Sequence, residues 1–458
     1  MRTTQCVRAG WLIGVLGACM IVAGAARADV TTERPGSILI FPKVVADGTR
    51  DTVIQISNTG NVLDQARCFY INGQRGRNGI AQCNETDFLI SLTKQQPTSW
   101  LASTGRYPTG LDGLDPGLVP PVPIGFTGAL VCVEVDASLS PVAMNALKGE
   151  VTLEGPGADL GKYNGIAFLG NTSGINDQNN DLKLDGVEYN ACPATSRVNL
   201  VTAAAPDPII FGLGNAGVCI NDSGDPCTTD ADCTTGTCGR FTCAGGANDG
   251  GVCASDTECP GGTCTGAGLA SVTTNVTVLP CNMDMNAQVP TAVRLNFQGF
   301  EGDETPFSAS TSVPISCWGN FNIAPPVFPV IPTEFGTLEI SSGAGGAVLA
   351  VIQTVHSDSI GNTATAALNA HMEGQCVGQC SGGSVRCVSD ADCTGGATCI
   401  GTVGRACTSN VDCTPGTCSG PRFCKGGPTA GRACTDDSSC GSGGTCPLPS
   451  AVIRLPGA

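Results

Sequence analysis

Apolar and polar residues alternate along short stretches of the chain, and this two-residue period is the main structural signal. The segment DTVIQIS at 51–57 puts its apolar side chains on one side, and the turn-forming NTGN at 58–61 follows it. This period is typical of strands with one buried face, and short apolar runs between turn residues are also typical of strands. The predicted strands are 37–41, 51–57, 67–71, 88–92, 128–135, 150–154, 165–169, 197–203, 208–211, 270–279, 292–297, 308–316, 337–341, 347–355, 363–370 and 451–455.

The spacing of these strands favours an all-β architecture. No segment keeps an apolar period of 3.6 residues, so we expect helix to be minor. Short strands separated by Gly- and Pro-rich turns favour antiparallel pairing. We therefore predict a mainly β fold, with an antiparallel β-sandwich body and two disulfide-rich, loop-dominated insertions. The predicted parts are a signal peptide at 1–28, a first β domain at 29–205, a cysteine-rich insertion at 206–266, a second β domain at 267–374 completed by 447–458, and a second cysteine-rich insertion at 375–446.

A cysteine spacing, C-x5-C-x4/5-C, recurs five times inside the two insertions. The copies are Cys227, Cys233, Cys238; Cys253, Cys259, Cys264; Cys387, Cys393, Cys399; Cys407, Cys413, Cys418; and Cys434, Cys440, Cys446. Units of this size cannot bury a hydrophobic core, so we expect disulfides to hold them together. Predicted strands flank each insertion, and we expect the strand at 451–455 to return from the second insertion and pair with the body.

Each region of the predicted mature chain has an even number of cysteines. The first insertion has eight and the second has twelve, and two of the 28 lie in the predicted signal peptide. In an exported chain an even count indicates a disulfide framework. The body contains Cys68, Cys83, Cys132, Cys192, Cys281 and Cys317. Proximity in sequence favours Cys68–Cys83, Cys132–Cys192 and Cys281–Cys317, among about fifteen pairings that six cysteines allow.

The N-terminal segment has the anatomy of a secretory signal peptide. Arg2 and Arg8 form a basic region before an apolar run at 9–26, and an A-x-A cleavage site follows at 26–28. Cleavage there predicts a mature chain that begins at Asp29 and is secreted or held at the cell surface. A lipid anchor on Cys19, within LGAC, is the alternative, although the apolar run continues past this cysteine. No other segment has the roughly 18 apolar residues of a spanning helix, so we expect no transmembrane segment.

Charge and histidine content narrow the classes of partner and cofactor. The net charge is −16, with 23 basic residues and no basic cluster, so we expect no nucleic-acid binding. Zinc is disfavoured, because the chain has two histidines and no C-x2-C pair. The histidines, His356 and His371, are not accompanied by G-x-S-x-G or H-E-x-x-H motifs. We therefore name no catalytic residue and no organic cofactor.

The stretch GINDQNNDLKLDGVEYN at 174–190 has some features of a calcium-binding loop. Asp177, Asn179 and Asp181 stand at alternating positions, and Glu188 is the twelfth residue when Asp177 is counted as the first. Leu182 occupies the sixth position, where a calcium loop of this kind needs glycine. These four oxygen-bearing side chains are the candidate calcium ligands. The alternative is a polar β-turn, in which Asn, Asp and Gly supply the backbone conformation.

Within the insertions, the pattern C-x-x-D-x-[DE]-C resembles the N-terminal cysteine-rich motif of the Dickkopf family. The matching segments are Cys227-Asp230-Asp232-Cys233, Cys253-Asp256-Glu258-Cys259 and Cys387-Asp390-Asp392-Cys393. This resemblance covers only the two insertions, and it implies a disulfide-bonded extracellular module that mediates protein contacts. The body, with GSILIFPKV at 36–44 and KYNGIAF at 162–168, resembles uncharacterised exported β proteins of environmental bacteria. That second resemblance implies no activity.

These observations favour an exported structural or adhesive protein whose disulfide-stapled repeats offer a contact surface to a protein or a surface glycan. A secreted hydrolase acting on glycans is one alternative, since a carboxylate pair is brought together by the fold and leaves no sequence motif. Trp100, Trp318 and Tyr163 could then form a sugar platform, although core packing is the more economical explanation. A calcium-stabilised surface module is the other alternative.

Overall fold

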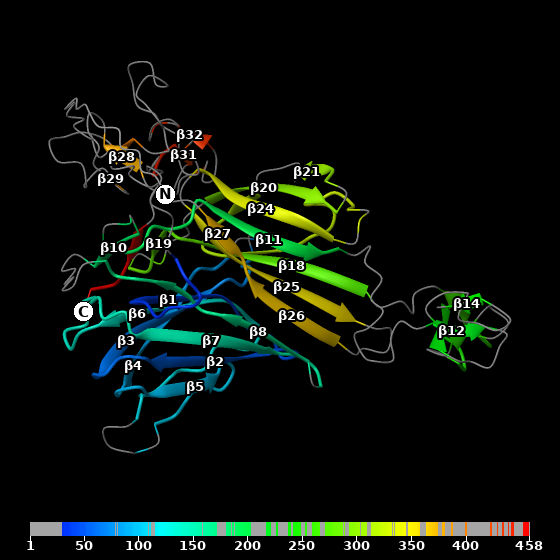
Figure 1. The fold of residues 1–458 in the computed structure, drawn as a ribbon, viewed down its shortest axis with the longest axis horizontal. Coiled ribbons are helices and arrows are strands. Elements are labelled where there is room, and N and C mark those ends of the chain that lie inside the picture. The colour runs from blue at the N-terminus through cyan, green and yellow to red at the C-terminus, as the bar shows by residue number, and fades with distance from the viewer. Residues whose placement is uncertain are drawn as a thin grey trace, which may run out of the picture.

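The protein is built from strands. The computed structural model describes residues 30–202, 271–373 and 452–457 apart from short gaps, together with short stretches within 217–265 and 378–443. Every element in this described part is a strand, and every strand pair is antiparallel except one (Figure 1). The exception is β19 (Met283–Asp284) with β33 (Val452–Arg454). The prediction of a mainly β, antiparallel fold is confirmed.

Two sheets from the first part of the chain face each other across one core. The first sheet has the order β4 (Glu85–Leu92), β3 (Asp64–Asn72), β6 (Phe126–Val135), β1 (Ile38–Ala46), β9 (Ile166–Phe168), and the second has the order β5 (Pro97–Leu101), β2 (Asp51–Asn58), β7 (Leu147–Glu154), β8 (Leu160–Asn164). Along β2 every second residue is buried, as its sequence predicted. Its Ile54 and Ile56 pack in the same cluster as Leu39 of β1 and Tyr70 of β3.

Strand β1 is buried along all nine residues, because it has a core on each side. Leu39 and Phe41 belong to the cluster just described, whereas Ile38 and Ile40 belong to a second cluster. The strand predicted at 37–41 is longer than the sequence pattern indicates, because Pro42 does not end it. The strand continues to Ala46 through an irregularity in its register after Phe41. A bulge tolerates proline, because a bulged residue need not donate a ladder hydrogen bond.

The later part of the chain adds two more sheets. One has the order β23 (Gly319–Asn322), β18 (Ser271–Pro280), β25 (Val348–Ser357), β26 (Thr363–Asn369), and the other has the order β21 (Pro306–Ser308), β20 (Val293–Glu301), β24 (Phe335–Ala344), β11 (Thr195–Val201), β27 (His371–Glu373), with β22 (Val313–Ile315) also on β20. Val198, Val276, Leu295 and Ile340 join them in a third core cluster. Strand β11, from the first part of the sequence, thus pairs within the later sheets.

The two parts of the chain pack directly on each other. The cluster around Ile38 and Ile40 also contains Leu279, Leu349 and Ile453. Strand β8 lies beside β26 (Figure 1), where Asn369 accepts the backbone N–H of Asn164 at 3.0 Å and donates to its carbonyl at 2.7 Å. Strand β33 lies between β10 (Asp181–Lys183) and β19, so the segment after the second insertion pairs with the body.

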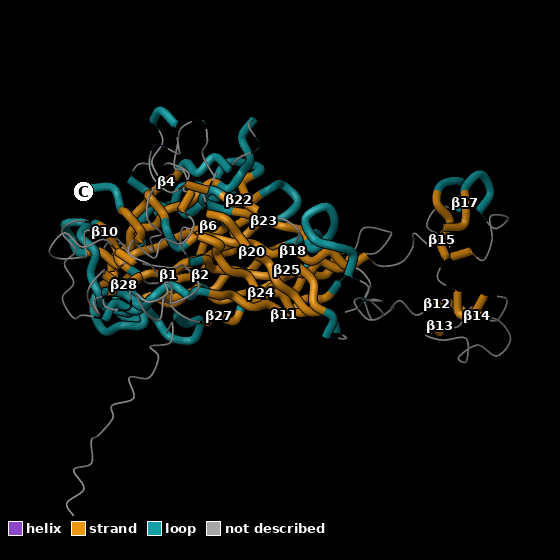
Figure 2. Tube along the Cα trace, turned by 90° about the horizontal axis from the view of Figure 1, so that it is seen from above, coloured by secondary structure: helices purple, strands orange, loops and turns teal. Residues whose placement is uncertain are grey.

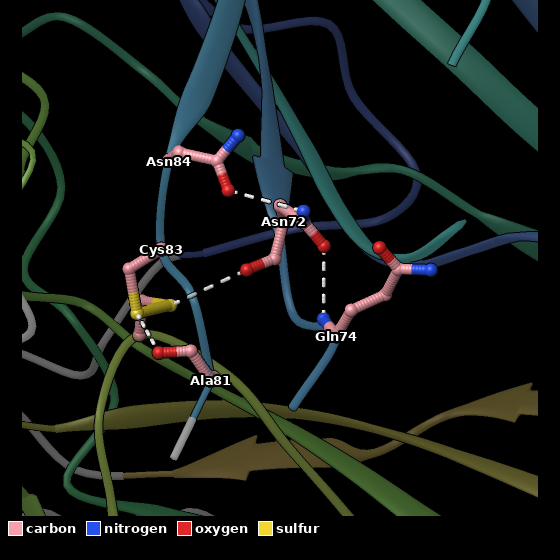
Figure 3. The surroundings of a disulfide bond; sticks show 6 residues. Asn72, Gln74, Ala81, Cys83 and Asn84 are labelled. Carbon is pink, nitrogen blue, oxygen red and sulfur yellow. Dashed lines mark hydrogen bonds between the residues drawn. A yellow bond between two sulfur atoms is a disulfide. The ribbon is translucent and has the colours of Figure 1, made fainter. Parts of the chain in front are cut away.

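The six body cysteines form three disulfides among themselves, but the proposed pairings are wrong. The bonds are Cys68–Cys132, Cys83–Cys317 and Cys192–Cys281. The first joins directly opposite positions of neighbouring strands β3 and β6, which proximity in sequence could not reveal. The other two connect the early and late parts of the chain. Beside Cys83, the Asn72 side chain donates to Asn84 at 3.0 Å and accepts the Gln74 backbone N–H at 2.9 Å (Figure 3).

The cysteine repeats form small sheets of a common design. In each of three units the first strand is central: β12 (Gly217–Ile220) between β13 (Pro226–Cys227) and β14 (Thr237–Gly239), β15 (Phe241–Ala244) between β16 (Val252–Cys253) and β17 (Thr263–Thr265), and β28 (Gly378–Cys380) between β29 (Arg386–Cys387) and β30 (Cys399–Ile400). A shorter pair joins β31 (Arg422–Phe423) and β32 (Ala433–Cys434). Figure 2 shows the strands β12 to β17 apart from the body, and Figure 1 shows the same for β12 and β14.

The described part of the repeats contains one disulfide, Cys243–Cys259. It includes Cys259, the middle cysteine of the second predicted copy, and links it to the cysteine on the central strand β15. The other cysteines of the five copies have side chains outside the described residues: Cys227, Cys233, Cys238, Cys253, Cys264, Cys387, Cys393, Cys399, Cys407, Cys413, Cys418, Cys434, Cys440 and Cys446. The predicted signal peptide and Cys19 also lie outside them.

Candidate functional site

A polar groove of about 810 Å³ opens on the outer face of the sheet β5-β2-β7-β8. Because Ile54 and Ile56 point into the core, the intervening Gln55 and Ser57 of β2 point outward. Strand register extends this polar face across the sheet. Ser99, Gln55, Glu150 and Asn164 are opposite one another on the four strands and form one continuous row.

Charged side chains at the groove are held by neighbours. Arg106 pairs with Asp115 at 2.8 Å and donates to the Gly117 carbonyl at 2.7 Å. Glu150 pairs with Lys162 at 2.8 Å. Ion pairing and sheet register fix the positions of these groups before any ligand arrives, so the groove offers preorganised hydrogen-bond donors and acceptors. The alternation of the 51–57 segment places the β2 side chains outside, but it does not reveal that they line a hollow.

The three aromatic residues considered for a sugar platform are in the interior. Trp100 and Trp318 are 4% and 8% exposed, and Tyr163 is also buried. The Trp100 indole donates to the Tyr70 hydroxyl at 2.6 Å, and the Trp318 indole donates to the Pro42 carbonyl at 2.8 Å. A buried indole N–H needs such a partner. Their role is therefore core packing, and they do not form a ligand platform.

A pair of carboxyl groups is buried between the ends of β3 and β6. Asp64 is 1% exposed and Glu134 is fully buried. Glu134 accepts the backbone N–H groups of Met144, Asn145 and Ala146 at 2.6–2.8 Å, whereas neither carboxyl oxygen of Asp64 has a hydrogen-bond partner of normal geometry. Burial, and then the neighbouring Glu134 charge, raise the pKa of Asp64 to about 8. Burial also raises the pKa of Glu134, opposed by its hydrogen bonds.

A lysine is buried where the early and late parts of the chain meet. Lys43 follows Pro42 at the irregular step of β1 and is 5% exposed. Its Nζ lies 3.3 Å from Oδ1 of Asn320 on β23, and the Thr277 hydroxyl of β18 donates to the same oxygen at 2.8 Å. Burial, and then the nearby Arg50 charge, lower the pKa of Lys43 to about 7, with Asp47 acting in the opposite direction. The sequence shows only a lysine inside an apolar run.

The calcium candidates are only partly described. Asp177 and Asn179 lie outside the described residues. Asp181 pairs with Arg454 at 3.3 Å, and Glu188 accepts the backbone N–H of Lys183 at 3.3 Å. In the described part of the chain no group of three or more His, Cys, Asp or Glu side chains is placed to hold a metal ion. The calcium site stays a prediction.

The same described residues contain no helix that is long and apolar enough to span a membrane.

Comparison with known proteins adds weak likenesses. No protein-family model matches the chain, and no curated protein matches it. Among solved structures, the chemokine-binding protein R17 of rodent gammaherpesvirus Peru is 9% identical, with a TM-score of 0.14 over 73% of this chain and 85% of that one. The Pleurotus ostreatus lectin in its apo form is 13% identical, with a TM-score of 0.12 over 82% and 92%. At these scores neither likeness extends to the fold.

Proposed function

We propose that this is an exported adhesive protein that binds hydroxyl-rich glycans in the polar groove of the sheet β5-β2-β7-β8. The observation that carries the proposal is the row Ser99, Gln55, Glu150 and Asn164, which places hydroxyl, amide and carboxylate groups side by side on a rigid sheet. Sugar hydroxyls both donate and accept hydrogen bonds, and amide and hydroxyl side chains do the same. Neighbouring strands in a sheet are about 4.8 Å apart, so the row of four side chains spans about 14 Å across the sheet.

Binding without hydrolysis is the function that this lining supports. Glycoside hydrolysis ordinarily uses two carboxyl groups on either side of the scissile bond. Among the described residues that line the groove, Glu150 is the one carboxylate, and Lys162 is ion-paired to it. Among its described lining residues the groove thus has no second carboxyl group for this reaction.

The remainder of the architecture supports an extracellular setting. Four disulfides among the described residues indicate an oxidising compartment, and the predicted signal peptide agrees with this. We propose that the facing sheets of the body are layers of an antiparallel β-sandwich, supported by the cores that they share. The repeats with their small sheets would present a second contact surface, directed at proteins.

The test is binding of the mature chain to a panel of immobilised neutral and acidic polysaccharides. We expect the double variant Gln55→Ala, Ser99→Ala to bind at least about 10-fold more weakly, because two hydrogen bonds of about 1 kcal/mol each are lost. Gln65→Ala is the matched control, since Gln65 lies on β3 of the other sheet and bonds Ser91 at 3.0 Å. If the double variant and the wild type bind polysaccharide with equal affinity, the assignment of the groove as the glycan-binding site is refuted.

Two further measurements separate the alternatives. Deletion of 206–266 should leave glycan binding unchanged, because the groove residues come from other segments; loss of binding would assign the ligand to the repeats. Release of reducing ends from a bound polysaccharide would show hydrolysis and contradict a purely adhesive role.

A further inference from the structure

The environment of Lys43 combines features that a lysine needs in order to act as a nucleophile. Its side chain crosses from β1 to the β18–β23 pair, and its Nζ lies 3.3 Å from the side-chain carbonyl oxygen of Asn320. The carbon of that carbonyl is about 1.2 Å from the oxygen. Because the hydrogen-bond angle at that oxygen is at least 90°, Nζ lies about 3.5–4.5 Å from Cγ. A movement of at most about 1 Å brings the two atoms to the separation at which reacting groups are held before bond formation, about 3–3.5 Å.

Two neighbours prepare the reaction. Burial lowers the pKa of Lys43 to about 7, so a large fraction of the amine is neutral and has a free electron pair near neutral pH. The Thr277 hydroxyl donates a hydrogen bond of 2.8 Å to Asn320 Oδ1. A donor in that position polarises the carbonyl and stabilises negative charge on its oxygen in the transition state. Thr277 and Asn320 are opposite each other on β18 and β23, so the sheet register fixes this contact.

We propose that Lys43 and Asn320 join in an intramolecular isopeptide bond. The Nζ electron pair attacks Cγ of Asn320, and charge develops on Oδ1 against the Thr277 hydroxyl. One Nζ proton passes to Nδ2, the Cγ–Nδ2 bond breaks, and ammonia leaves. The product is a secondary amide between Nζ and Cγ, and no oxidant or reductant takes part. Asn320 is partly exposed, which gives ammonia a way out, while Lys43 is shielded from water.

The bond would act as a second clamp between the early and late parts of the chain. It ties residue 43 to residue 320, whereas the disulfide Cys83–Cys317 ends three positions before Asn320. Unlike the disulfide, an amide survives reduction. The body would therefore keep one covalent tie in a reducing environment.

Mass spectrometry of the reduced, purified mature chain tests the proposal. We expect a mass lower than the sequence predicts by one molecule of ammonia, and one protease fragment in which the peptides containing Lys43 and Asn320 are joined. Separate linear peptides with unmodified Lys43 and Asn320 would overturn the proposal. This wild-type measurement needs no variant that could fail to fold.

Variants then assign the chemistry. Lys43→Met and Asn320→Ala should each abolish the joined fragment, and Thr277→Val should slow its appearance after refolding by about 10-fold or more, as expected for loss of an oxyanion donor. Refolding at pH 8 should give faster joining than at pH 6, because more of the amine is neutral. Lys162→Met, a change at an exposed lysine paired with Glu150, is the control and should leave the joined fragment intact. Joining that persists in Lys43→Met would refute the assignment.

Discussion

The buried Asp64 should make the stability of the body fall as pH rises. Its pKa is raised from an ordinary 3.8 to about 8, so between these values the folded chain keeps a proton that the unfolded chain releases. Stability decreases with pH wherever the folded state binds more protons than the unfolded state. The contribution of Asp64 is thus complete below about pH 4 and is lost progressively up to about pH 8.

The substitution Asp64→Asn removes this titration while keeping the size of the side chain. A shift of about four pKa units at about 1.36 kcal/mol each sets a ceiling of about 5 kcal/mol, and water entry and relaxation around the pair reduce it. We expect the free energy of unfolding of Asp64→Asn, relative to wild type, to increase by at least about 2 kcal/mol between pH 4.5 and pH 8. Any fixed penalty for burying the amide is the same at both pH values.

The assay is urea unfolding at several pH values with the disulfides intact, followed by the fluorescence of the buried Trp100 and Trp318. Glu339→Gln is the control, since Glu339 is partly exposed and pairs with Arg197 at 2.9 Å on the later sheets. That variant should keep the wild-type dependence on pH. If Asp64→Asn and wild type show parallel stability curves between pH 4.5 and pH 8, the assignment of a retained proton to Asp64 is refuted.

Three further predictions follow from contacts in the body. Glu134→Gln should lower the free energy of unfolding by about 3 kcal/mol, because an amide cannot accept all three backbone N–H groups that the carboxylate accepts; unchanged urea unfolding would contradict this. Replacing Cys83 and Cys317 with serine opens a loop of 234 residues and should cost about 5 kcal/mol in the chain-entropy account, seen as a lower calorimetric melting temperature. Gly128→Ala would place a Cβ against a backbone carbonyl of β3 and should lower thermal stability by about 2 kcal/mol, whereas Gly457→Ala, in open space, should not.

Local pattern was enough to locate most of the long strands. The alternation at 51–57 became β2, and the apolar run at 128–135 became β6 with two additional residues. The strand β5, with sequence PTSWL, was missed, because it is short and begins with proline. Period and turn residues act over a few positions, so they find strands but not the order of strands in a sheet.

Pairings over long distances depend on packing that the sequence pattern does not contain. Cys68 bonds Cys132 because β3 and β6 are neighbours in one sheet, although β4 and β5 intervene in sequence. The same limit applies to Lys43, whose partner Asn320 is 277 positions away. The groove residues of β2 could be predicted to face outward, but the hollow needs β5, β7 and β8 beside them.

The position of β33 has a consequence for how the molecule is made. This strand follows both cysteine-rich insertions in sequence, yet Val452, Ile453 and Leu455 belong to the same core cluster as Ile38 of β1. A chain exported from its N-terminus onward, as proposed here, presents β1 to the new compartment first and β33 after every other strand that the structure describes. The final closure of that cluster must therefore follow translocation of both insertions, so their cysteines can meet the oxidising machinery while the body is still open to folding helpers.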